Sequence, residues 1–262
     1  MTLAAMKMTD RTRKAEHFRA LHIPGKPLLL FNIWDAGSAK AVGAAGAKAI
    51  ATSSWSVANA NGFSDGEQMP LALAIENLRR IVGATALPVT FDLESAYGDT
   101  PEVTAETVDL AIEVGAVGGN LEDSFPTNGK LRETVNQCER VRSARRAAEA
   151  AGIRFFINAR TDVFFQRPPA EHDNAMLDDA IERARAYAEA GADGIFVPGL
   201  VATKLISCLA QSSPLPVNIM VGDGTSPLQE LAEHGVARVS YGPSPYLKAM
   251  KALEERARTA SV

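Results

Sequence analysis

The sequence predicts a (β/α)8 barrel of the TIM type, built as a single domain over residues 1–262 with one helix ahead of the first strand. Eight short apolar runs alternate with eight helical stretches, which indicates a parallel sheet covered by helices. Eight such units close most naturally as a barrel, and α/β barrels commonly fill about 250 residues as one domain. No linker, low-complexity tract or block of charge divides the chain.

The predicted strands are short runs rich in apolar and branched residues. They span residues 28–33, 49–52, 89–92, 117–121, 155–158, 194–197, 217–220 and 237–240. An open, doubly wound sheet is the alternative arrangement of the same units. No GxGxxG or GxxxxGKS/T sequence follows any strand, so the sequence supports neither a dinucleotide site nor a P-loop.

The predicted helices fill the segments between the strands. They cover roughly residues 10–22, 36–45, 70–82, 101–114, 132–150, 174–190, 202–211, 227–234 and 245–258. Glycines suited to the left-handed position that ends a helix precede five of the strands, at Gly46, Gly115, Gly152, Gly191 and Gly235. Asp35 and Thr100 are expected N-caps, and Ser226 with Gln229 forms a predicted capping box. The longest irregular segments are then residues 56–69, 123–131 and 163–173.

The amino-acid composition limits the class of partner. A net charge of -4 argues against nucleic acid, and it means that an anionic substrate needs local positive charge from a metal or an arginine. No apolar run approaches the ~18 residues of a membrane span. Cys138 and Cys208 stand apart without disulfide or metal spacing, which is typical of a reducing cytoplasm. We therefore expect a cytoplasmic protein that acts on a small anionic molecule.

Three carboxylates stand at the ends of two successive predicted strands. Asp92 ends the third strand, Glu94 follows it, and Glu122 comes directly after the fourth. The carboxyl ends of barrel strands converge on one face, and buried carboxylates are costly unless a cation joins them. Oxygen donors without histidine or cysteine favour Mg²⁺ or Mn²⁺ over zinc. The cluster therefore predicts a site for a hard cation.

Arg160 follows the fifth strand, on the same predicted face. Its guanidinium can hold two oxygens at once, so it is a natural partner for a substrate carboxylate or phosphonate. An ion pair with the acidic cluster is the alternative. Ser53 and Ser54 follow the second strand, but no histidine at the strand ends would serve them as a base, so a serine hydrolase is not supported.

Four segments, in order, resemble those of the isocitrate lyase/phosphoenolpyruvate (PEP) mutase superfamily. Residues 53–55 (Ser-Ser-Trp) are similar to its Ser-Gly-Trp or Ser-Gly-Leu substrate loop, and residues 92–98 to its Asp-x-Asp-Thr-Gly-Tyr-Gly segment. Residues 121–123 are similar to its hydrophobic-Glu-Asp segment, and residues 158–162 contain its Ala-Arg-Thr-Asp. The resemblance covers nearly the whole chain.

The resemblance implies an α/β barrel whose last helix is exchanged with a neighbouring subunit, in a homodimer or homotetramer. It implies that Mg²⁺ is held by Asp92, Glu94 and Glu122, directly or through water. The substrate would be an α-oxo or α-hydroxy acid whose carboxylate lies against Arg160 and the loop formed by Ser53, Ser54 and Trp55.

Two further positions match active-site residues of the superfamily. Asp65 matches an acid of the mutase branch. Asn218 is similar to the strand-seven asparagine of the lyases, which implies that it would bind substrate, although it stands two residues early, on the same face but one layer deeper.

The segment after the fourth strand departs from the superfamily pattern. Lyases carry Lys-Lys-Cys-Gly-His there, and its cysteine is the usual acid, whereas residues 124–130 read Ser-Phe-Pro-Thr-Asn-Gly-Lys. Phe125, Pro126 and Asn128 resemble the mutase branch's Phe-Pro-Lys-x-Asn-Ser, but Thr127 stands where that motif has its lysine. Glu94 replaces an aspartate, and Ala96 replaces a turn glycine.

The expected activity is that of a Mg²⁺-dependent carbon–carbon lyase or decarboxylase acting on an oxaloacetate-like or methylisocitrate-lyase-like acid through an enolate. Arg160 would orient the substrate, Glu122 would fix metal-bound water, and Asp65 would be a further catalytic residue. We expect little cleavage of isocitrate or methylisocitrate, since residues 124–130 offer no suitable acid. Carbon–phosphorus chemistry, as in phosphonopyruvate hydrolysis or mutation, and non-catalytic binding of α-oxo acids are the alternatives.

Overall fold

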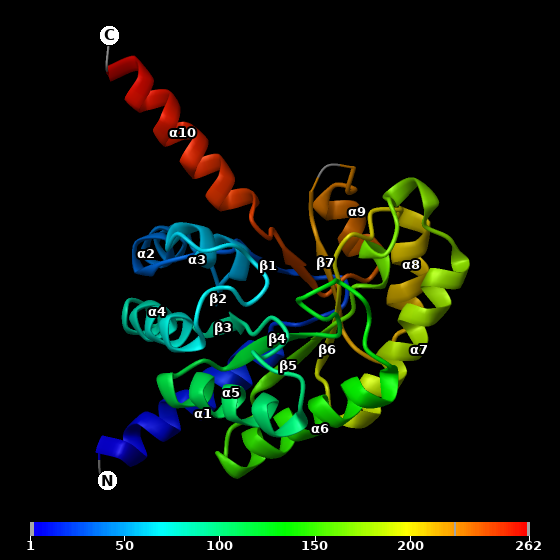
Figure 1. Cartoon of the computed structure of the whole chain (residues 1–262), viewed down its shortest axis with the longest axis horizontal. Coiled ribbons are helices and arrows are strands. Elements are labelled where there is room, and N and C mark those ends of the chain that lie inside the picture. Colours follow the sequence, from blue (N-terminus) through cyan, green and yellow to red (C-terminus); the bar gives the residue numbers. More distant parts are fainter. Residues whose placement is uncertain (1–2, 223, 261–262) are drawn as a thin grey trace.

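The computed structural model describes residues 3–222 and 224–260 and confirms the predicted barrel (Figure 1). Its eight strands are parallel and follow the order β1-β8-β7-β6-β5-β4-β3-β2. They are β1 (Leu28–Leu30), β2 (Ile50–Ala51), β3 (Val89–Asp92), β4 (Gly118–Glu122), β5 (Phe156–Arg160), β6 (Gly194–Val197), β7 (Val217–Met220) and β8 (Arg238–Ser240). A bridge between Ile33 and Thr52 joins the two ends of the sheet beyond β1 and β2, which closes the barrel.

Helices surround this sheet, and their bounds agree with the predicted ones to within a few residues except at the first helix. They are α1 (Leu3–Ala20), α2 (Ala36–Ala44), α3 (Ser54–Ala60), α4 (Leu71–Gly83), α5 (Pro101–Val114), α6 (Thr134–Ala150), α7 (Asn174–Ala190), α8 (Thr203–Ser212), α9 (Leu228–Glu233) and α10 (Ser244–Ala260). Two short 3-10 helices, η1 (Val163–Phe165) and η2 (Pro169–Glu171), lie within the segment predicted to be irregular. The prediction of irregular structure over residues 56–69 was wrong where α3 forms.

Most of the predicted helix ends are confirmed, and one is wrong. Gly46, Gly115, Gly152, Gly191 and Gly235 all have positive φ angles. Asp35 and Thr100 cap α2 and α5 through their side chains. The capping box at Ser226 does not form, because α9 begins at Leu228 after Pro227. The Ser226 hydroxyl instead lies 2.7 Å from Thr203 Oγ1, so it links the segment before α9 to the start of α8.

The amino-terminal end of the barrel is closed by aromatic side chains. Phe18 of α1 and His22, which lies just beyond α1 rather than inside the first helix as predicted, both pack against Phe156 at the start of β5. The His22 and Phe156 rings stack with centroids 4.0 Å apart. Burial lowers the pKa of His22 to about 3, so the imidazole is neutral here. These side chains therefore block access to the interior of the barrel from its amino-terminal end.

The last helix does not cover the barrel. In Figure 1 α10 extends away from the body of the protein, and Leu247, Met250 and Leu253 on it are 49%, 36% and 63% exposed. None of the helices over residues 3–222 and 224–260 has the length and apolar character needed to cross a membrane.

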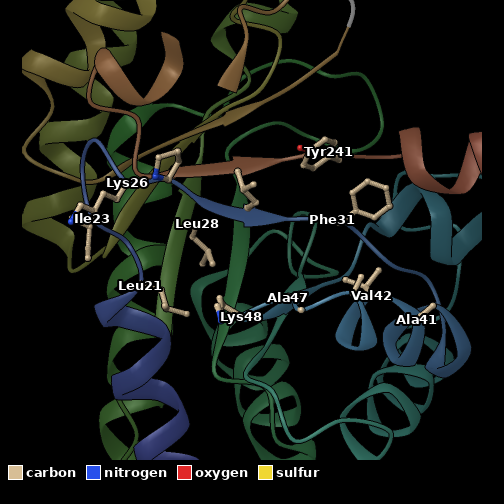
Figure 2. A pocket seen from close by; sticks show the side chains of 14 residues that line it. Leu21, Ile23, Lys26, Leu28, Phe31, Ala41, Val42, Ala47, Lys48 and Tyr241 are labelled. Atoms are coloured by element: carbon tan, nitrogen blue, oxygen red, sulfur yellow. The ribbon is translucent and has the colours of Figure 1, made fainter. Parts of the chain in front are cut away.

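An apolar groove of about 770 Å³ lies on the outer wall of the barrel, beside β1 (Figure 2). Leu29 and Phe31, which point outward from β1 and its extension, are 43% and 45% exposed. Ala41 and Val42 of α2 form another wall. The groove is larger than the cavity at the strand ends, but it contains no acidic side chain among its lining residues. It therefore has the character of a packing surface rather than of a reaction site.

Candidate active site

A cavity of about 190 Å³ lies at the carboxyl ends of the strands. This volume is small beside the ~300–1,000 Å³ typical of sites for drug-sized ligands, so it suits a small molecule. Strands β3 to β8 and the segments after β1 and β2 all contribute side chains to it. The lining residues are Asn32, Ser53, Ser54, Trp55, Asp65, Asp92, Asn120, Arg160, Phe165, Phe196, Pro198, Met220, Ser240, Gly242 and Pro243.

The structure brings six of the nine predicted site residues to this cavity. Ser53, Ser54, Trp55, Asp65, Asp92 and Arg160 all line it. The other three, Glu94, Glu122 and Asn218, do not. Asn218 is 1% exposed and lies one layer deeper in the barrel, where its Oδ1 accepts a hydrogen bond from Asn158 Nδ2 at 3.1 Å.

Asp92 is held in place by the start of α3. The prediction treated residues 53–55 as a loop, but Ser53 is the N-cap of α3 and its hydroxyl accepts a hydrogen bond from Ser56 N. This capping directs the next amide, Ser54 N, toward Asp92 Oδ2 at 3.1 Å. On the other side, Asn120 Nδ2 donates to Asp92 Oδ1 at 3.3 Å. The carboxylate is thus fixed at the cavity wall from two neighbouring elements.

Glu94 is engaged by a strained turn next to the cavity. Its Oε2 accepts a 2.7 Å hydrogen bond from Glu67 N, and its Oε1 accepts one from the Tyr97 hydroxyl at 3.3 Å. Glu67, Glu94, Ala96 and Tyr97 have φ angles of 62°, 52°, 57° and 56°. Such backbone conformations cost about 1–3 kcal/mol each and persist where the surroundings enforce them, often at functional sites. The left-handed Ala96 is consistent with the glycine that the superfamily carries in this turn.

Burial raises the pKa of Glu94 to about 8, and the nearby charges of Asp92 and Asp65 add to the effect. Burial also raises the pKa of Asp65, again with a contribution from Asp92. Asp65, Asp92 and Glu94 therefore repel one another when no cation is bound between them.

Arg160 bridges two carboxylates. Its Nη1 donates to Glu122 Oε1, and its Nε donates to Asp162 Oδ1 at 2.6 Å. Burial alone would lower the pKa of Arg160, but Glu122 and Asp162 raise it, so the guanidinium is firmly charged. The ion pair with the acidic cluster, which the sequence left open, is present, and Arg160 still lines the cavity.

Part of the lining was not predicted from the sequence. Asn120 and Ser240 point inward from β4 and β8, and a polar residue within an apolar strand is a signal that would have identified both. Phe165, Phe196 and Met220 form an apolar wall. Arg160 lies over the rings of Phe165 and Phe196, at 5.7 Å and 5.9 Å from their centroids.

The segment after β4 stays outside the cavity. Ser124 and Leu131 form an antiparallel bridge that folds residues 124–131 back on themselves. The Ser124 hydroxyl donates to Asp162 Oδ2 at 2.6 Å, and no residue of this segment lines the cavity. Cys138 lies inside α6 and Cys208 inside α8, as predicted, and neither lines the cavity.

The donors fit a hydrated hard cation. Within the described part of the chain, no three histidine, cysteine or acidic side chains are placed to surround one metal ion. Mg²⁺ needs only one or two protein carboxylates, because it keeps several of its waters. Asp92 supplies one carboxylate at the cavity wall, and Glu94 and Glu122 are close enough for electrostatic coupling with it. A cation beside Asp92 would relieve the repulsion between these acids.

Comparisons with known proteins show similarity to a family of enzymes over most of the chain. The family described as phosphoenolpyruvate phosphomutase matches residues 18–261. A crystal structure from Burkholderia cenocepacia J2315, provisionally described as a phosphonomutase, is 57% identical with a TM-score of 0.93, covering 95% of this chain and 99% of that one. The 2-methylisocitrate lyase of Escherichia coli (strain K12) is 29% identical over 91% of this chain and 83% of its own. The oxaloacetate decarboxylase of Rhodopseudomonas palustris (strain BisA53) is 32% identical over 69% of this chain and 61% of its own.

Proposed function

The chain belongs to the phosphoenolpyruvate phosphomutase family, within the isocitrate lyase/PEP mutase superfamily, and we propose that it is a Mg²⁺-dependent lyase that breaks a carbon–carbon bond next to the oxo group of a short α-oxo acid. The observation that carries this proposal is the cavity itself. It places Asp92, Asp65 and Arg160 within one small volume at the carboxyl ends of the strands. That combination of acids and one fixed guanidinium suits a cation and a carboxylate side by side.

Each residue has a role toward the substrate that follows from its position. Asp92 would bind Mg²⁺ directly, and Glu94 and Glu122 would bind it through water molecules. Bound Mg²⁺ would act as a Lewis acid that stabilises the negative charge of the enolate. Arg160, held by Glu122 and Asp162, presents its guanidinium to the cavity in a fixed orientation and would position the substrate carboxylate.

Asp65 is suited to proton transfer. It lines the cavity, and its pKa is raised by burial and by Asp92. A general acid or base works best when its pKa lies near the working pH. We assign Asp65 the role of exchanging a proton with the enolate or with a water beside it.

The cavity favours a short substrate. Arg160 is the cation among its lining residues, and Phe165, Phe196 and Met220 stand on the apolar wall. The cation at Asp92 and the Arg160 guanidinium would balance two carboxylates, and a third would meet apolar side chains rather than positive charge, which is unfavourable. Oxaloacetate-like acids fit better than tricarboxylates. The similarity to an oxaloacetate decarboxylase supports this choice.

Carbon–phosphorus chemistry is the second candidate. It is favoured by the similarity to the Burkholderia protein that is provisionally described as a phosphonomutase. A phosphonate would place more negative charge in the cavity than a carboxylate, and the cavity offers one arginine and no lysine. We therefore rank carbon–carbon cleavage first.

Turnover assays separate these functions. The purified protein with Mg²⁺ is given oxaloacetate, short substituted malates and phosphonopyruvate, and pyruvate, the carbonyl product and phosphate are measured. Release of pyruvate or another oxo acid from a carbon substrate without phosphate supports the lyase. Formation of phosphoenolpyruvate, or of pyruvate and phosphate, from phosphonopyruvate supports the second candidate. Binding of these acids without any turnover would leave a protein that only senses or sequesters α-oxo acids.

We also propose that the protein is a homo-oligomer in which α10 of one subunit packs on another. The groove beside β1 lies where a helix after β8 would cover a barrel, whereas α10 extends away from it (Figures 1 and 2). Tyr246, Met250 and Leu253 follow the i, i+4, i+7 spacing of one helical face. A second copy would bury both of these apolar surfaces.

A further inference from the structure

Arg238, the first residue of β8, lies inside the barrel beneath the cavity. Its side chain is 0% exposed. Its Nη2 donates to Asn120 Oδ1 at 3.2 Å, while Nε and Nη1 are buried without a hydrogen-bond partner among the described residues. No carboxylate of the described residues forms an ion pair with it. A buried charge with so few partners is costly, so its presence needs an explanation.

The nearest source of attraction for this charge is Asp92. Burial lowers the pKa of Arg238 to about 9, and Asp92 is the group that raises it. On the amino-terminal side lies His22, which is neutral. The charged group with which the Arg238 guanidinium interacts favourably is therefore Asp92, the carboxylate at the wall of the cavity.

Asn120 lies between the two charged groups, and its contacts fix the orientation of its amide. Its Oδ1 accepts hydrogen bonds from Arg238 Nη2 at 3.2 Å and from Asn158 Nδ2 at 2.9 Å. Its Nδ2 donates to Asp92 Oδ1 at 3.3 Å. A guanidinium can only donate, so it requires the oxygen of Asn120 to face it and leaves the NH₂ group to face Asp92.

We propose that Arg238 is a positioning residue for the active site, which acts through Asn120 to hold Asp92 in its binding orientation. This inference rests on the proposed function, because it concerns the carboxylate assigned to Mg²⁺ there. Without the guanidinium, Asn158 Nδ2 is the remaining donor to Asn120 Oδ1 among the described residues, so the Asn120 amide turns its oxygen toward Asp92 more readily. Two oxygens would then repel each other, and Asp92 would leave the position in which Ser54 N also holds it.

A purely structural role explains Arg238 less well. Burying a charge that has no ion-pair partner is costly, so packing alone does not favour an arginine over an apolar side chain of similar volume in the barrel. The hydrogen bonds that join Arg238 to Asn120 and Asn120 to Asp92 explain why a charged side chain occupies this position.

Mg²⁺-dependent oxalate binding, measured by calorimetry, tests the inference. We expect Arg238→Met and Asn120→Ala each to raise the oxalate Kd by at least ~10-fold. The double variant should bind no more weakly than Asn120→Ala alone, because Arg238 acts through Asn120. Arg238→Lys, which keeps a donor for Asn120 Oδ1, should recover most of the affinity.

A matched control distinguishes an effect on the orientation of Asp92 from a general loss of protein stability. Arg145→Met removes a different, partly buried arginine, which pairs with Asp193 away from the cavity, and it should lower the melting temperature without changing the oxalate Kd. Should Arg238→Met fail to fold, Arg238→Gln makes the same comparison. Its amide can present an oxygen as well as an NH₂ group, so it no longer requires the oxygen of Asn120 to face it, and weaker binding is again expected.

The outcomes distinguish this inference from the proposed function. An unchanged oxalate Kd in Arg238→Met or Arg238→Gln would overturn the positioning role alone, as would strictly additive effects of Arg238→Met and Asn120→Ala. Failure of the wild-type protein to bind oxalate with Mg²⁺ would overturn the proposed function, and the positioning role with it.

Discussion

The main-chain amide of Glu67 donates a 2.7 Å hydrogen bond to Oε2 of Glu94. The loop after α3 is thereby attached to the turn after β3, and both residues have positive φ angles. Tyr97 N returns a 2.7 Å hydrogen bond to Glu67 Oε1, so the contact is reciprocal. Glu94 is consequently a buried acid that supports the wall of the site, and its protonation affects the stability of the metal-free protein.

The metal-free protein should lose stability as the pH rises from about 4.5 toward about 8. The folded-state pKa of Glu94 is raised to about 8, mainly by burial, so between these values the folded state keeps a proton that the unfolded state has lost. The contribution of Glu94 to this slope reaches about 1.4 kcal/mol per pH unit at most. Glu94→Gln should flatten the slope, measured by urea unfolding in EDTA. Glu106→Gln, at an exposed position on α5, serves as the control, and equal slopes in Glu94→Gln and wild type would refute this assignment.

Arg160→Lys should weaken Mg²⁺-dependent oxalate binding by at least ~10-fold. A lysine ammonium cannot reach Glu122 and Asp162 together while presenting a planar fork to the cavity. Calorimetric titration measures the effect, and Arg142→Lys, at an exposed ion pair on α6, is the matched control. Unchanged binding in Arg160→Lys would place the carboxylate of the ligand elsewhere.

Isocitrate and methylisocitrate should be cleaved poorly or not at all. Their retro-aldol cleavage leaves an enolate that a positioned acid must protonate, a contribution of ~10²–10⁴-fold to the rate. Residues 124–131 and both cysteines supply no such acid at the cavity. Asp65, to which we assign proton transfer, lines a cavity suited to a short acid, and the third carboxylate of a tricarboxylate would meet its apolar wall. Steady-state assays check this. A kcat in the ordinary range of ~1–10³ s⁻¹ on either tricarboxylate would show that another residue supplies the proton and that the substrate assignment is wrong.

Charge on the apolar face of α10 should disrupt the oligomer. Met250→Glu with Leu253→Glu places two carboxylates where we propose that α10 meets the groove of another subunit, and this burial of charge is unfavourable. Light scattering after gel filtration should then report a monomer. Glu255→Lys, a charge reversal on the opposite face of α10, should leave the oligomer intact. A wild-type monomer would contradict the proposed assembly.

Much of the fold follows from local signals in the sequence. Each strand could be located because a parallel barrel strand is an apolar run, and the ends of helices such as α5 could be placed because Thr100 and Gly115 suit their caps. The helix α3 was missed because Ser-Ser-Trp reads as a loop and the cap at Ser53 becomes evident only with its partner amide at Ser56.

Residues that line the cavity could be predicted where the type of side chain indicates a ligand. They could not be predicted where the backbone conformation determines the orientation of the side chain. Asp92 and Arg160 line the cavity as expected. Glu94 turns toward Glu67 because its φ angle is positive, a property that the sequence does not reveal for a glutamate. Asn218 lies deeper because it is two residues short of the strand end, and Arg238 was missed because an arginine within an apolar strand was read simply as part of that strand.

The central claim is a site that binds a small oxo acid together with Mg²⁺, and oxalate measures it most directly. Thermal unfolding is followed with oxalate in the presence of Mg²⁺ and in EDTA, for the wild-type protein and for Asp92→Ala. Oxalate at ~100 times its Kd should add about 2.7 kcal/mol and raise the wild-type midpoint by roughly 5 °C or more, with Mg²⁺ only. Asp92→Ala should fold but show no shift. Equal shifts in EDTA, or an Asp92→Ala protein that responds like the wild type, would contradict the account.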